Sequence, residues 1–401
     1  MPGKKPISPT ITSTDMRWIN RAAILDLIRT SGPISRTEVA AQLQISLPTV
    51  MRIVDELMAE GLVRDANRKA WSGGRKRTLI EFNGSESVIV GVDLGGTKLF
   101  GAVADLNGNI LEEMYFTHHQ TTAEESFLEL KRAIDTLIAA AERTGCKLLG
   151  IGVGVPGITH PETGVVTMAP SLSWDEFPLK ERLSALYSYP VAVENDVNLA
   201  ALGELWFGTD ADLYNLVLIA IGTGIGAGVI IDGVVYRGKH HMAGEIGYLL
   251  PDRSSLEQTY PGFGALEQKA SGTGIAARAR EVLKDQRPAE ELAALSAEDV
   301  FHAARRGEPW ATSIVAETVD YLAQAIAAVT LLYDPDVILL GGGVARSADL
   351  LIQPILARLE GRIPWLPRLT ASRLGYRAGV LGSIVTLLRM TANYYILHKF
   401  S

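Results

Sequence analysis

The sequence predicts an α/β protein in which a small helical domain precedes a larger body of alternating strands and helices. Three observations lead to this fold class. Short capped helices fill roughly the first eighty residues, apolar strands alternate with helical segments from Ser87 to about Arg389, and glycine-rich loops directly follow three of those strands. We expect three domains, which comprise residues 1–83, 84–200 and 201–401.

The first domain contains two short helices joined by a tight turn. Apolar residues at helical spacing predict a helix over residues 20–30. Ser35 and Glu38 form a capping box for a second helix, and Ser46 caps a third helix that ends at Gly61. This pattern is typical of a helix-turn-helix, whose second helix presents Ser46, Thr49 and Arg52 to DNA.

A basic hairpin follows these helices. Residues 62–64 and 78–82 are candidate strands, and the segment between them contains two glycines and five cations. A winged helix has such a wing, whose cations contact DNA phosphates or enter the minor groove. The candidate DNA-binding cations are Arg68, Arg75, Lys76 and Arg77. The alternative is a solvated basic loop on a three-helix packing domain.

The charge distribution also separates this domain from the rest of the chain. The net charge is −7 overall, yet residues 1–83 carry 13 Lys and Arg against 8 Asp and Glu. Such asymmetry is expected of a nucleic-acid-binding arm, although small domains often vary by several charges.

The body shows the order of elements expected for two actin-like halves. Strands are predicted in the first half over residues 88–92, 99–104, 109–116 and 149–155, with a helix over residues 125–143. In the second half, strands are predicted over residues 216–221, 226–231 and 337–340, with a long helix over residues 310–332. Asp105–Gly108 and Asp232–Gly233 are predicted hairpin turns.

Three glycine loops after strands predict a nucleotide-phosphate site. Backbone N–H groups in such turns form concavities that bind anions. The candidate residues for the nucleotide are Asp93, Gly95, Gly96, Thr97, Lys98, Thr223, Gly224 and Gly342. Steric demands at strand–helix turns also explain any one of these glycines taken alone.

The segment Glu194-Asn-Asp196 follows an apolar strand and opens a helix. A carboxylate at Asp196 could take the proton of a sugar hydroxyl that attacks a γ-phosphoryl group, and Asn195 could bind sugar hydroxyls. Asp is also among the best N-cap residues, and the residues alone favour that structural role for Asp196.

Taken together, these motifs resemble the ROK family (repressors, open reading frames and kinases), specifically its members with an N-terminal winged helix. The resemblance implies a winged helix followed by a two-lobed actin-like, ribonuclease-H-like sugar-kinase fold. It also implies that Asp93–Lys98 bind ATP phosphates and that Asp334–Gly343 lie at the adenosine side. The sugar-binding residues that it implies are Gly157, Asn195, Asp196, Glu245, Tyr248 and Glu267.

The chain departs from the family pattern at the structural zinc site. The family's zinc ligands are one His and three Cys, and the matching positions here are Tyr248, Gln258, Tyr260 and Ala265. We therefore expect no structural zinc, and we expect packing of Tyr248, Tyr260, Pro261 and Phe263 to hold the loop. Ser171 stands where the family often has Asn, which would remove or remodel one sugar contact.

The composition of the chain bears on its cellular location. The one cysteine, Cys146, excludes an intrachain disulfide, and no run of about 18 uninterrupted apolar residues indicates a membrane span. No apolar segment follows the first five residues, so no secretory signal is expected and the predicted location is cytoplasmic.

The resemblance implies two functions that do not exclude each other. The first is a DNA-binding transcriptional regulator, a repressor, that binds an operator as a homodimer or homotetramer and responds to a sugar or sugar phosphate. The second is an ATP-dependent sugar kinase that uses Mg-ATP with Asp196 as the base. The complete phosphate loop from Asp93 to Lys98 keeps the second open.

Overall fold

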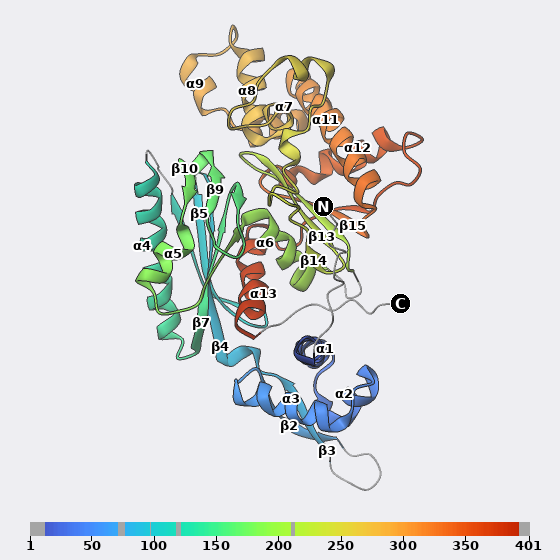
Figure 1. Ribbon diagram of the computed structural model, residues 1–401. Coiled ribbons are helices and arrows are strands. Elements are labelled where there is room, and N and C mark those ends of the chain that lie inside the picture. The colour runs from blue at the N-terminus through green and yellow to red at the C-terminus, as the bar shows by residue number, and fades with distance from the viewer. Residues whose placement is uncertain (1–12, 71–76, 97, 118–121, 210–212, 393–401) are drawn as a thin grey trace, which may run out of the picture. The chain divides into compact units, whose positions relative to one another are not determined.

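The computed structural model describes residues 13–70, 77–96, 98–117, 122–209 and 213–392 (Figure 1). The described residues form two compact units. One contains the residues up to Ser87, Asp105–Asn107 and those from Leu388, and the other contains Val88–Ala104 and Gly108–Leu387.

The first unit is a winged helix. Its elements are α1 (Ser13–Ser31), β1 (Ile34–Ser35), α2 (Arg36–Leu43), α3 (Leu47–Ala59), β2 (Val63–Ala70) and β3 (Arg77–Phe82). The strands form a small antiparallel sheet in the order β1-β3-β2. The fully buried side chains of Ile24, Ile28, Val39, Ile53 and Leu57 form the core between its helices. Helix α1 begins seven residues before the predicted start, and β2 continues six residues beyond Arg64.

The predicted caps are present in this unit. The Ser35 side chain accepts a hydrogen bond from the Glu38 backbone N–H, and the Glu38 carboxylate accepts one from the Ser35 N–H. Ser46 caps α3 through the Thr49 N–H, and Gly61 follows the helix with a φ of 83°. These caps fix where α2 and α3 begin.

The first half of the second unit is built on a five-stranded sheet in the order β11-β7-β4-β5-β6. The strands are β4 (Ser87–Leu94), β5 (Lys98–Asp105), β6 (Ile110–Thr117), β7 (Lys147–Val155) and β11 (Val191–Asn195). Helix α4 (Ala123–Arg143) packs its buried face against this sheet in one apolar core, and α5 (Leu179–Leu186) belongs to the same core. A separate small antiparallel sheet consists of β8 (Ile158–Thr159), β9 (Val166–Ala169) and β10 (Trp174–Phe177).

The second half repeats this architecture with the sheet order β14-β13-β12-β15-β16. The strands are β12 (Leu216–Ile221), β13 (Ile225–Ile231), β14 (Val234–Val235), β15 (Val337–Gly341) and β16 (Leu369–Ala371). The helices are α6 (Asp196–Gly203), α7 (Ala265–Ala270), α8 (Gly272–Leu283), α9 (Ala289–Ala294), α10 (Ala297–Arg305), α11 (Pro309–Tyr333), α12 (Ile352–Leu359) and α13 (Ala378–Ala392). Within the second unit, Val380 of α13 packs with Phe100 and Ala102 of β5.

Helix α11 is the longest helix among the described residues. Its length and mean hydropathy would also suit a membrane span, and 56% of its most apolar window is buried. Its buried residues, among them Ile314, Leu322 and Ile326, belong to the core of the second half. The helix therefore acts as a core element of this unit.

Candidate functional site

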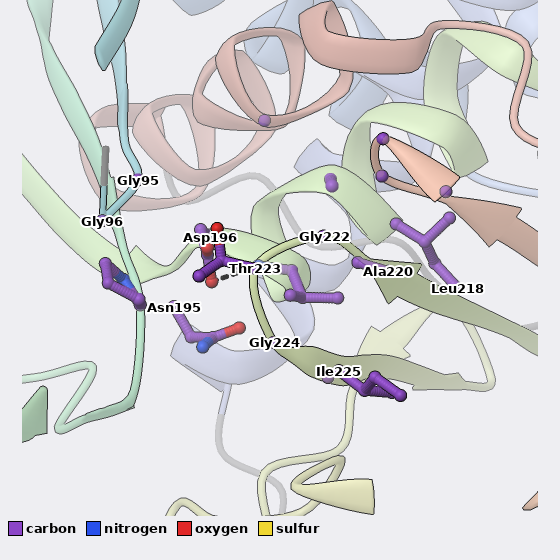
Figure 2. A pocket seen from close by; sticks show the side chains of 18 of the residues that line it. Gly95, Gly96, Asn195, Asp196, Leu218, Ala220, Gly222, Thr223, Gly224 and Ile225 are labelled. Carbon is purple, nitrogen blue, oxygen red and sulfur yellow. Dashed lines mark hydrogen bonds between the residues drawn. The ribbon is translucent and has the colours of Figure 1, made fainter. Parts of the chain in front are cut away.

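Loops that follow strands of both sheets line one cleft of about 530 Å³ in the second unit (Figure 2). Asp93 lies near the end of β4, Asp196 follows β11, Gly222 follows β12 and Gly342 follows β15. In α/β proteins, ligands bind where the carboxyl ends of strands meet, because loops and helix N-termini converge there. All predicted nucleotide and sugar residues line this cleft except Lys98 and Thr97. Lys98 is exposed at the start of β5, and Thr97 lies outside the described residues.

Asn195, rather than Asp196, is the N-cap of α6. The Asn195 Oδ1 atom accepts from the Asn198 N–H at 2.9 Å, and its Nδ2 donates to the Gly157 carbonyl at 3.0 Å. The capping role that the sequence favoured for Asp196 is therefore wrong. Asp196 is the first helical residue, and its carboxylate lines the cleft beside the Gly222–Gly224 loop (Figure 2).

Burial raises the pKa of three carboxyl groups in this cleft, those of Asp93, Asp196 and Glu245. Burial, followed by the charge of Asp196, raises the pKa of Asp93, and burial raises that of Asp196 itself. Burial, followed by the charges of Asp196 and Glu267, raises the pKa of Glu245 to about 7. A carboxyl with a raised pKa can accept a proton near neutral pH, which is what a general base needs.

Glu267 uses both carboxylate oxygens to hold backbone. Its Oε1 accepts from the Ile225 N–H at 2.8 Å, and its Oε2 accepts from the Gly264 N–H at 2.7 Å. The side chain thus ties the start of β13 to the N-terminus of α7 while it lines the cleft. A sugar hydroxyl would have to share these oxygens with the backbone.

The loop after β14 carries Glu245 and Tyr248 to the cleft. Gly244 lies beside Ala227 of β13, and the Ala227 N–H donates to the Gly244 carbonyl at 2.7 Å. The Tyr248 hydroxyl donates to the Gly262 carbonyl at 2.7 Å. Of the four side chains expected to hold this segment by packing, Tyr248 and Tyr260 are half-buried, and the expectation is wrong for Pro261 and Phe263, which are exposed. The hydrogen bond of Tyr248 also holds the segment.

The glycines at the nucleotide side leave open space. A Cβ atom at Gly222 or Gly343 would meet nothing within 4 Å, and both residues line the cleft. Packing therefore does not demand glycine at these two positions. The space fits a ligand that approaches the backbone closely, as a nucleotide phosphate does, so these residues fit Mg-ATP.

Several cleft residues were not predicted from the sequence. Ser372 and Tyr376 line the cleft, and Arg346 is the one cation among the described lining residues. The buried Glu204 holds this segment, since its carboxylate accepts from the Ser372 hydroxyl and, at 2.8 Å, from the Leu374 N–H. Glu204 itself could have been identified from the sequence, because it is a glutamate that directly follows the apolar helix α6.

The DNA-binding candidates lie in the first unit. Ser46 caps α3, its hydroxyl lies 2.8 Å from that of Thr49, and Arg52 is half-exposed on the same helix, paired with Glu56 at 3.1 Å. Arg68 and Arg77 belong to β2 and β3, while Arg75 and Lys76 lie outside the described residues.

No group of three potential metal ligands exists within the described part of the chain. The rings of His160 and His241 lie 4.5 Å apart, and the Nδ1 atom of His241 is buried without a hydrogen-bond partner among the described residues. The absence of a structural zinc remains a prediction that metal analysis of the purified protein can test.

The fold and site define a protein with a sugar-kinase-like body that carries a winged-helix DNA-binding domain. The chain belongs to the ROK family, which residues 89–389 match, and residues 20–64 match the winged helix-turn-helix DNA-binding family.

The relatives of this chain include both transcriptional regulators and sugar kinases. The xylose repressor of Caldicellulosiruptor bescii is 27% identical over 385 residues, which cover 94% of this chain and 96% of the repressor. The glucokinase of Halalkalibacterium halodurans is 34% identical over 313 residues, which cover 74% of this chain and 94% of the kinase. The crystal structure of a ROK family transcriptional regulator, a homologue of the Escherichia coli MLC protein, superposes with a TM-score of 0.81 at 26% identity and covers 93% of this chain and 96% of that one.

Proposed function

We propose that this chain is a cytoplasmic, sugar-responsive transcriptional repressor that binds operator DNA as a homo-oligomer. The observation that carries the proposal is that one chain combines a capped helix-turn-helix with a cleft lined by carboxylates. The match covers 94% of this chain for the xylose repressor and 93% for the MLC homologue, whereas the glucokinase match covers 74%.

The charges of the cleft favour a free sugar over a sugar phosphate. Three of the four carboxyl groups that line it, those of Asp196, Glu245 and Glu267, belong to the predicted sugar site, and Arg346 after β15 is the one cation among the described lining residues. Carboxylates accept hydrogen bonds from sugar hydroxyls, whereas a phosphate group on the sugar would meet like charge at these three residues. Calorimetry with a panel of sugars and their 6-phosphates tests this, and tighter binding of a phosphate would contradict it.

The DNA-binding role can be tested on the region upstream of the chain's own gene. We expect Arg52→Ala to weaken binding and to reduce the dependence of log affinity on log salt by about 1, because one phosphate contact is lost. Arg305→Ala, which removes an exposed arginine paired with Asp349 in the second unit, is the matched control. Unchanged affinity and salt dependence for Arg52→Ala would contradict the assignment of this helix.

A second function, ATP-dependent sugar phosphorylation, is favoured by the joint presence of Asp93, Asp196 and the open glycine loops. Mg-ATP, when bound, supplies the phosphoryl group. Asp196 would accept the proton of the attacking sugar hydroxyl, and the backbone of the loops at Gly222 and Gly343 would face the phosphates. The raised pKa of Asp196 suits this role near neutral pH.

A kinase assay separates the two functions. The protein is incubated with Mg-ATP and glucose, N-acetylglucosamine, mannose, fructose or xylose, and ADP release is compared with that of Asp196→Ala. Release above that of the variant supports catalysis, and equal release limits the chain to sugar sensing.

A further inference from the structure

We propose that Arg237 is a positioning residue for the predicted sugar site of the cleft. Its ion pair with Glu194 would fix the position of the Asn195–Asp196 segment relative to the loop that carries Glu245. The inference rests on the proposed sugar binding. Neither side chain lines the cleft, so the pair would act through the residues that do.

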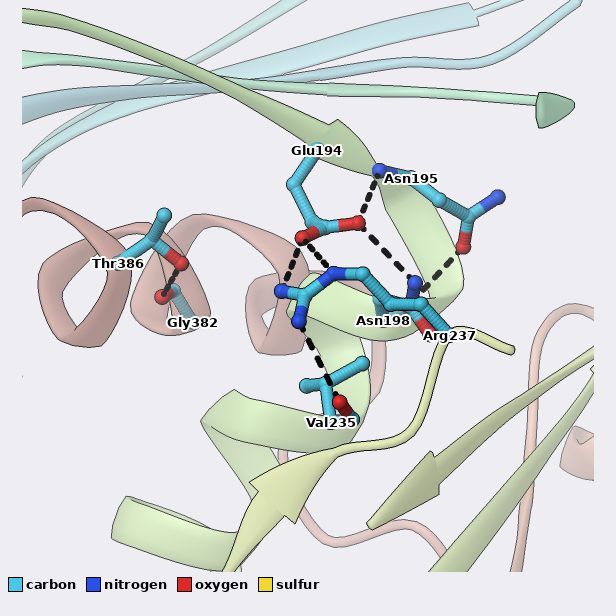
Figure 3. Close-up of polar contacts among 7 residues, drawn as sticks. All are labelled: Glu194, Asn195, Asn198, Val235, Arg237, Gly382 and Thr386. Carbon is cyan, nitrogen blue, oxygen red and sulfur yellow. Dashed lines mark hydrogen bonds and ion pairs between the residues drawn. The ribbon is translucent and has the colours of Figure 1, made fainter. Parts of the chain in front are cut away.

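Glu194 is a buried charge with a complete set of partners. Its side chain is 2% exposed, and it lies at the end of β11, directly before the N-cap of α6. The Oε1 atom accepts from the Asn195 backbone N–H and from the Asn198 Nδ2, both at 3.0 Å (Figure 3). The carboxylate thus fixes both residues that define the first turn of α6, the turn that begins with Asp196.

Arg237, in the loop after β14, neutralises this carboxylate. Its Nε donates to Glu194 Oε2 at 3.0 Å, its Nη2 donates to the same oxygen, and its Nη1 donates to the Val235 carbonyl at 3.3 Å (Figure 3). A buried carboxylate without a cation would be costly, so the pair constrains where the two segments lie. Lysine could supply the charge but not the same set of donors.

The backbone of Arg237 closes the loop that carries Glu245. Its carbonyl accepts from the Ala243 N–H at 3.0 Å, and Gly244 then pairs with Ala227 of β13. Arg237 therefore connects two parts of the cleft that come from different sheets, Asp196 after β11 and Glu245 after β14.

Sugar affinity of the full-length protein tests the proposal. We expect Arg237→Met to raise the dissociation constant of the best sugar about tenfold or more, because the two carboxyl groups lose their relative placement. Arg237→Lys should recover part of the loss, and the operator affinity of the sugar-free protein should stay unchanged. Arg305→Met, which breaks the exposed pair with Asp349, is the matched control and should leave sugar affinity unchanged.

The double variant Glu194→Gln/Arg237→Met removes the buried carboxylate together with its half-buried cation. It leaves no unpaired buried charge, so it tests the proposal even where the single variant fails to fold. It should also bind the sugar about tenfold more weakly. A dissociation constant within about twofold of the wild type in a folded variant would overturn the positioning role. If the wild type itself binds none of the sugars, the proposed function fails instead.

Discussion

Glu245 illustrates how a single residue carries the chemistry of the cleft. It is held on a short loop near Asp196 and Glu267, and its pKa of about 7 makes it half protonated at neutral pH. A protonated carboxyl can donate a hydrogen bond to a sugar oxygen, whereas the ionised form only accepts. The site can therefore respond to pH through this residue.

The raised pKa of Glu245 predicts a pH-dependent stability. The folded state holds the proton more tightly than the unfolded chain, so stability falls as the pH rises from the unfolded value of 4.5 through about 7. Glu245→Gln removes this loss, and we expect its stability relative to wild type to rise by roughly 2 kcal/mol between pH 5 and pH 8. Urea unfolding across this range measures the effect.

The control for this prediction is Glu257→Gln, which replaces an exposed glutamate further along the chain. It should leave the pH profile of unfolding unchanged. Parallel profiles for wild type and Glu245→Gln would show that Glu245 titrates normally in the folded protein.

At the scale of elements, the loops at the strand ends determine which side chains line the cleft. Gly244 has a φ of 96°, and a Cβ there would lie 1.8 Å from the Ala227 carbonyl oxygen. Only glycine fits this approach without a backbone shift. The position of Glu245, one residue later, depends on it.

Gly244→Ala should therefore displace the Glu245 loop and weaken sugar binding about tenfold or more, since the clash adds to the cost of a positive φ. Gly307→Ala is the matched control, because Gly307 also has a positive φ of 78° but a Cβ there meets nothing within 4 Å. It should lower stability by about 1 kcal/mol and leave sugar affinity unchanged. Equal sugar affinity in both variants would contradict this account of the loop.

Elements with strong local signals were the ones that the sequence predicted well. The capping box of Ser35 and Glu38, the apolar strands and the hairpin turn at Asp232–Gly233 depend on neighbouring residues, so their positions could be inferred. The cap of α6 was assigned to the wrong residue because Asn195 and Asp196 are both good caps, and only the backbone geometry separates them. The ion pair of Glu194 with Arg237 spans 43 residues, and no local pattern indicates it.

At the scale of the whole molecule, one chain of the ROK family combines a winged-helix DNA-binding unit with a unit for which we propose sugar binding. Sugar can change DNA affinity only through a difference in its own affinity for the DNA-bound and free proteins. The linkage is reciprocal, so operator DNA must change the sugar affinity by the same factor.

The most direct test measures operator affinity against sugar concentration, at fixed salt, for the wild type and for Asp196→Asn. The account predicts that the sugar weakens operator binding by the wild type by about fivefold or more, and that Asp196→Asn needs much higher sugar concentrations for the same effect. An operator affinity that stays constant while calorimetry shows the sugar bound would contradict the account.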